Sequence, residues 1–85
     1  MSAAELRAIA AALPRRHRAI ADFLAHRLER WAGAIERGDA EALRTAIAVC
    51  REEREMYPFE RETYQAAGHE IRFELEQLAP EEAVA

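Results

Sequence analysis

The sequence AIERGDAEAL at residues 34–43 forms the joint between two expected helices, and this joint decides the fold. Arg37 places a cation at the end of the first helix, Gly38 accepts the left-handed backbone of a C-cap, and Asp39 is a preferred N-cap for the second helix. Because so short a connection leaves room only for a tight turn, the joint predicts a helical hairpin.

The segment before the joint carries the strongest amphipathic pattern of the chain and predicts a helix over 15–36. Pro14 disfavours helical geometry in the residue before it and suits the first position of a helix. It therefore separates this helix from a short one over 3–13, although a single helix kinked at Pro14 is the alternative. The expected apolar face of the longer helix consists of Ile20, Phe23, Leu24, Leu28, Trp31 and Ile35.

The segment after the joint predicts two further helices, over 40–56 and 59–78, which Pro58 separates. Pro80 ends the last helix, and the tail at 80–85 is expected to fray. The core positions of the third helix are Leu43, Ala46, Ile47, Cys50 and Tyr57. Those of the fourth are Tyr64, Ala67, Ile71, Leu75 and Leu78, with Phe59 and Phe73 widening the apolar face.

These patterns predict one all-α domain over residues 1–85, an up-and-down helical bundle of three long helices plus a short N-terminal helix. Hydrophobic residues make up 51% of the chain, but 20 of them are alanines, so few large side chains serve four helices. Domains of this size barely offset the entropy of ordering the chain. We therefore expect dimerisation to complete the core.

Composition excludes several classes of protein. Charged residues interrupt every apolar run well short of the roughly 20 residues that span a bilayer, and the single Cys50 offers no disulfide framework. A cytoplasmic location is expected. The acidic net charge of −4 argues against nucleic-acid binding. All 12 basic residues are arginine and none is lysine, which indicates a GC-rich, bacterial genome, with selection for the planar guanidinium group as the alternative.

Charge is divided unevenly along the sequence. Residues 1–37 hold seven arginines against four acids, whereas residues 38–85 hold five arginines against twelve acids. Such halves attract each other, either within one chain or across a dimer.

Few residues are arranged for chemistry. Asp22, His26 and Glu29 share a helix face and are the candidate metal ligands, although a solvated charged stripe is the alternative. Cys50 and His69 are expected to pack in the bundle, with His69 partly buried and hydrogen-bonded. No Glu-x-x-His pair, glycine-rich phosphate loop, catalytic triad or zinc spacing occurs. We predict no cofactor and no catalytic residue.

Two resemblances bear on architecture and function. The Ala34–Leu43 segment resembles the helical hairpins in the dimerisation domains of prephenate dehydrogenases and in effector domains of some bacterial repressors, which implies a bundle. Small helical mutases of the chorismate mutase type hold a dicarboxylate with several arginines, and Arg7, Arg44, Arg51 and Arg54 are available here. The chain departs from that family in lacking lysine and in breaking its first helix.

The leading hypothesis is a small non-catalytic protein–protein interaction or assembly module, acting as an accessory or regulatory subunit of a bacterial enzyme. The alternative is a bundle that binds a small molecule or metal, including a chorismate-mutase-like enzyme. Aromatic residues dominate interface energetics, and the candidate interface anchors are Phe23, Trp31, Tyr57, Phe59 and Phe73. For Phe23 and Trp31, packing within the core is the favoured interpretation.

Overall fold

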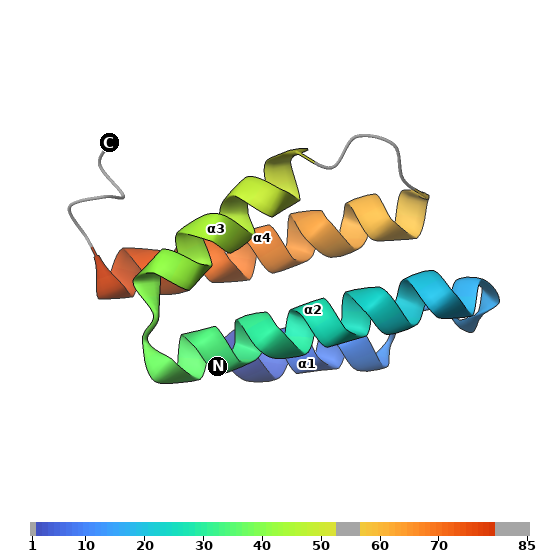
Figure 1. Ribbon diagram of the computed structural model, residues 1–85, viewed down its shortest axis with the longest axis horizontal. Coiled ribbons are helices and arrows are strands. Elements are labelled where there is room, and N and C mark those ends of the chain that lie inside the picture. The colour runs from blue at the N-terminus through green and yellow to red at the C-terminus, as the bar shows by residue number, and fades with distance from the viewer. Residues whose placement is uncertain (1, 53–56, 80–85) are drawn as a thin grey trace.

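The computed structural model describes residues 2–52 and 57–79, and nearly all of them lie in helices (Figure 1). The elements are α1 (Ser2–Ala11), a single 3₁₀ turn η1 (Arg15–His17), α2 (Arg18–Arg37), α3 (Ala40–Glu52) and α4 (Pro58–Leu78). No strand occurs within these two ranges. The predicted all-α class is confirmed, while the up-and-down bundle and its completion by a second copy stay predictions.

The joint between α2 and α3 forms as its sequence predicts. Gly38 adopts a left-handed backbone with φ of 66°, and its N–H donates to the carbonyl of Ile35 at 3.1 Å. The N–H of Asp39 donates to the carbonyl of Ala34 at 3.0 Å, and Asp39 Oδ1 accepts from the N–H of Ala42 at 3.1 Å. One residue therefore ends α2 and the next one caps α3.

Pro14 breaks the first helix and does not kink it. Its backbone is extended, with φ of −63° and ψ of 138°. α1 ends at Ala11, two residues before the predicted end, and regular α-helix resumes only at Arg18, after η1. The shorter α1 follows from the steric effect of proline on the residue before it.

The connection between α3 and α4 is described only from Tyr57 onward. α4 begins at Pro58, one residue before the predicted start, with the proline in the first turn. The N–H of Tyr57 donates to Glu60 Oε1 at 2.9 Å, which holds the entry to the helix. The predicted end of the third helix at residue 56 and the tail at 80–85 lie outside the described residues.

The helices pack as two neighbouring pairs, α1 on α2 and α3 on α4, with further contacts between the pairs (Figure 1). The largest side chains of the core are almost fully buried, namely Leu6, Leu24, Leu28, Leu43 and Ile71. Alanines fill the remaining space, and Ala32, Ala34, Ala46 and Ala67 have at most 1% of their surface exposed. Small residues thus let the helices approach closely.

Some residues expected in the core lie on the surface. Phe23 is 56% exposed. The buried face of α2 runs through Ala21, Leu24 and Leu28, and Phe23 points about 100° away from Leu24 around the helix axis. The prediction that Phe23 packs in the core is wrong. Tyr57, Phe73 and Leu78, also expected at core positions or on a widened apolar face, are 45%, 53% and 43% exposed.

Candidate functional site

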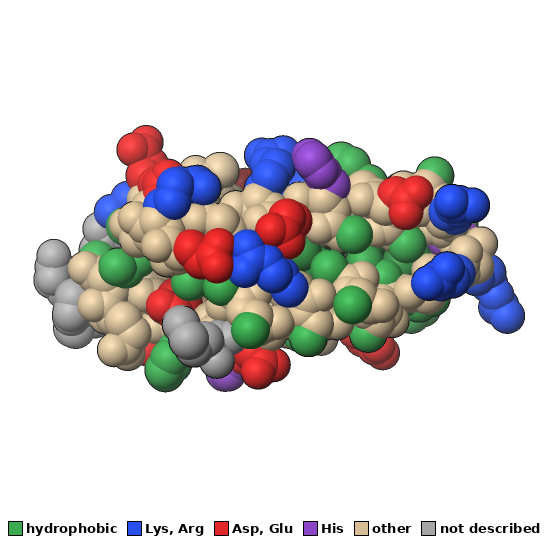
Figure 2. Space-filling model, turned by 90° about the horizontal axis from the view of Figure 1, so that it is seen from below, with side chains coloured by type: hydrophobic (Ala, Val, Ile, Leu, Met, Phe, Trp, Pro, Cys, Tyr) green, Lys and Arg blue, Asp and Glu red, His purple; other side chains and the backbone are tan. Residues whose placement is uncertain are grey.

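Three aromatic rings join η1 to the start of α4. The His17 ring stacks on that of Tyr57, with 4.1 Å between centroids and 22° between planes. It also lies 5.6 Å from the Phe59 centroid at 7°, and the rings of Tyr57 and Phe59 are 6.0 Å apart. The stack holds η1 against the N-terminal end of α4 although some forty residues separate them. Figure 2 shows basic side chains gathered at the end of the molecule where Figure 1 places η1.

A second aromatic group surrounds the Arg27 guanidinium. Its Cζ atom lies 4.6 Å from the centroid of Phe23 and 5.9 Å from those of Trp31 and Tyr64. Nη1 of Arg27 donates to the hydroxyl of Tyr64 at 2.6 Å, and the Trp31 and Tyr64 rings are 6.3 Å apart. Cation–π attraction on one side and a charge-assisted hydrogen bond on the other fix the position of Arg27. The exposed Phe23 ring is therefore held in place on the surface of α2.

The five candidate interface anchors have different environments. Phe23, Tyr57 and Phe73 are exposed, Phe59 is half-buried, and Trp31 is buried with 7% of its surface exposed. The sequence-based interpretation did not identify His17, Arg27 or Tyr64 as partners of these rings. The spacing of Phe23, Arg27 and Trp31 at i, i+4 and i+8 on one helix was the available signal, because residues four apart are neighbours on a helix surface.

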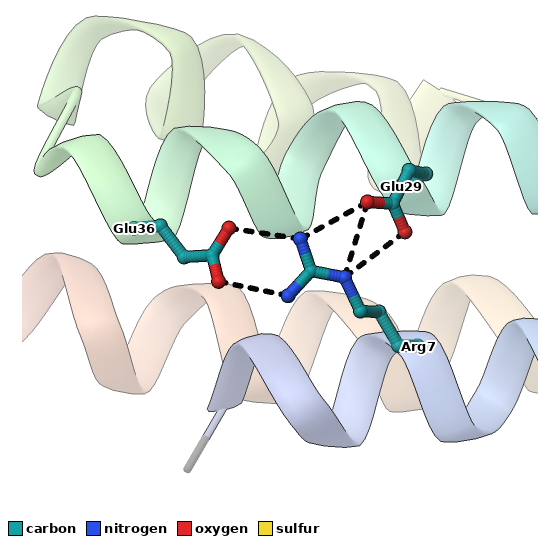
Figure 3. A network of polar contacts seen from close by, with 3 residues as sticks. All are labelled: Arg7, Glu29 and Glu36. Atoms are coloured by element: carbon teal, nitrogen blue, oxygen red, sulfur yellow. Dashed lines mark hydrogen bonds and ion pairs between the residues drawn. The ribbon is translucent and has the colours of Figure 1, made fainter.

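An arginine clamp joins α1 to α2 on the surface (Figure 3). Arg7 lies between two carboxylates that are seven residues apart on α2. Its Nη1 and Nη2 atoms each donate to Glu36 at 2.8 Å, and Nε and Nη2 donate to Glu29 at 3.0 to 3.1 Å. The hydrogen bonds to Glu36 and Glu29 raise the pKa of Arg7, and the hydrogen bond from Arg7 holds the pKa of Glu36 below its ordinary value.

The clamp makes stability depend on pH in a defined direction. Folding lowers the pKa of Glu36, so the ionised carboxylate stabilises the folded protein. This stabilisation is fully present at a pH above the ordinary glutamate pKa of about 4.3, and it is lost as the pH falls through the lowered pKa. We expect Arg7→Gln to lower Tm at neutral pH. The difference in Tm from wild type should vanish at a pH below both the ordinary glutamate pKa and the lowered pKa of Glu36 in the folded protein. Thermal unfolding followed by circular dichroism measures this. Arg72→Gln, at an exposed position of α4, is the control, and a pH-independent difference would contradict the prediction.

The candidate metal ligands do not form a site. Asp22, His26 and Glu29 are all exposed on α2, and Glu29 accepts hydrogen bonds from Arg7. Within residues 2–52 and 57–79, no group of three or more His, Cys, Asp or Glu side chains is arranged to hold a metal ion.

Cys50 and His69 lie on neighbouring helices but in different surroundings. Cys50 is half-buried opposite Gly68, where an added Cβ atom would lie 3.5 Å from the Cβ of Cys50, an ordinary contact distance. His69 is exposed, so the expectation that it packs partly buried is wrong.

The arginines that suggested a mutase lie on two different helices as far as they are described. Arg7 is held in the surface clamp, Arg44 and Arg51 are exposed on α3, and Arg54 lies outside the described residues. Arg7, Arg44 and Arg51 are absent from the lining of the pocket between α2 and the start of α3.

Comparison with family models, with curated proteins and with solved structures gives no significant match. In the part of the chain that the structure describes, no helix has the length and hydrophobicity needed to cross a bilayer. The functional interpretation therefore depends on the residues described above.

Proposed function

We propose that the protein is a small non-catalytic interaction module that assembles as a homodimer and acts in the cytoplasm as an accessory or regulatory subunit of an enzyme. In this proposal a second copy completes an up-and-down bundle. The observation that carries it is Phe23, a large apolar side chain more than half exposed on a long helix and held by Arg27. A fixed aromatic ring loses little conformational entropy on binding, which favours its use as an interface anchor.

Charge supports a second copy as the partner. η1 and α2 together carry six arginines against three acids, whereas α4 carries five glutamates against two arginines. In a two-fold dimer, α2 of each copy could lie against α4 of the other. The basic helix would then face the acidic helix at two symmetry-related contacts. Each of these helices also presents one exposed phenylalanine, Phe23 on α2 and Phe73 on α4.

Substitution of the two phenylalanines tests the proposal. We expect Phe23→Ser and Phe73→Ser each to weaken dimerisation by about 30-fold, the effect of losing an interface anchor worth about 2 kcal/mol. Sedimentation equilibrium over a range of concentrations measures the dissociation constant. Because both side chains are exposed, circular dichroism should show that the variants keep their helical content.

Leu78→Ser is the matched control. It removes an exposed apolar side chain that lies at the end of α4, close to Gly38 of the α2–α3 joint. We expect it to leave the dissociation constant within about threefold of wild type, a difference below about 0.7 kcal/mol. If wild type and both phenylalanine variants dimerise equally, the interface does not use these anchors and the proposal fails.

A further inference from the structure

A shallow pocket of about 470 Å³ lies between α2 and the start of α3, and Glu29 of the arginine clamp forms part of its lining. Its apolar lining includes Trp31, Ala34 and Ala42. Its polar lining includes His26, Arg30, Arg37 and the hydroxyl-bearing Thr45, besides Glu29. The volume is within the range of small-molecule sites.

The basic residues reach this pocket because of their spacing on α2. His26, Arg30 and Arg37 stand at i, i+4 and i+11, which places them on one stripe of a helix. Gly33 lies on the same stripe and leaves room for Arg37. A Cβ atom at Gly33 would lie 3.1 Å from Nη1 of Arg37, so an alanine there would require the end of this flexible side chain to move by a few tenths of an ångström.

Two acids lie near the arginines of the pocket. Glu29 also lines it but accepts hydrogen bonds from Arg7. Asp39 caps α3 and forms a long ion pair with Arg37, with 3.8 Å between Asp39 Oδ2 and Arg37 Nη2 and no hydrogen bond between them. Among residues 2–52 and 57–79, no carboxylate pairs with the Arg30 guanidinium. Both arginines are exposed and keep donors for a ligand.

We propose that this pocket binds a small organic anion, a phosphate or carboxylate carried on a flat apolar group. Arg30 and Arg37 would donate hydrogen bonds to the anion, since guanidinium groups match the geometry of phosphate and carboxylate oxygens. The apolar group would lie against Ala42 and the small exposed part of Trp31. This proposal does not depend on dimerisation, because every residue of the pocket belongs to one chain.

Fluorescence titration with phenyl phosphate tests the proposal directly. Trp31 is the single tryptophan of the chain and lines the pocket, so its emission reports on occupancy. We expect a saturable change in wild type at millimolar or lower concentrations. Inorganic phosphate, which lacks the ring, and benzyl alcohol, which lacks the charge, should each bind more weakly than phenyl phosphate.

Arginine substitutions locate the binding site. We expect Arg30→Gln and Arg37→Gln each to raise the dissociation constant of phenyl phosphate about tenfold or more, as the loss of a charge-assisted hydrogen bond predicts. Arg72→Gln on α4 is the matched control and should bind like wild type. Absence of a saturable signal in wild type, or equal affinity in the double variant Arg30→Gln/Arg37→Gln, would overturn the proposal.

Discussion

Leu28→Ala should lower the free energy of unfolding by about 2 to 5 kcal/mol, the usual cost of truncating a leucine in a packed core. Leu28 is 1% exposed and lies in the same buried cluster as Leu6, Leu43 and Ile71, which come from the other three α-helices. Loss of its side chain would leave a cavity in this buried cluster. Because small domains are stable by only about 5 to 15 kcal/mol, this single change removes a large part of the total.

Urea denaturation at a fixed protein concentration measures this effect, since dimerisation would make the result depend on concentration. Leu78→Ala removes the same atoms from a side chain that is 43% exposed, and it should cost less than about 1 kcal/mol. Equal losses in the two variants would show that Leu28 does not lie in a packed core.

Ala67→Leu should destabilise the protein by about 1 to 3 kcal/mol although leucine is more hydrophobic than alanine. Ala67 has no exposed surface and lies in the buried cluster with Ala32, Ala34 and Ala46. A larger side chain there has no space unless the neighbouring helices move apart. The variant therefore tests whether the alanines are close-packed contacts of the core.

Ala66→Leu is the control for this change, because it makes the same substitution one residue earlier at an exposed position of α4. We expect its free energy of unfolding to stay within about 0.5 kcal/mol of wild type. If Ala67→Leu is as stable as Ala66→Leu, the core has room that the structure does not show. Urea denaturation at the same protein concentration compares the two.

Local sequence signals predicted the helices because capping and proline effects act over a few residues. Gly38 and Asp39 define the α2–α3 joint through their own backbone preferences, and Pro14 separates two helices through the residue before it. Such effects do not depend on the rest of the chain. The same is true of the start of α4 at Pro58.

Contacts between distant segments were less predictable. The periodicity of α2 placed Phe23 on an apolar face. It did not define the width of the part of that face that is buried, because this width depends on where α1 and α4 pack. The partners of the exposed rings, Arg27 and His17, come into contact with α4 through tertiary packing. The clamp of Arg7 on Glu29 and Glu36 likewise requires α1 to lie along α2, and no local pattern encodes this.

The central proposal is that two copies of this chain assemble, and the molar mass of the wild-type protein in solution tests it most directly. Light scattering over a concentration series is expected to give a mass of about 19 kDa at micromolar and higher concentrations, twice the 9.6 kDa of one chain, and to fall toward 9.6 kDa on dilution. A mass of 9.6 kDa that does not change over the whole series would contradict the proposal.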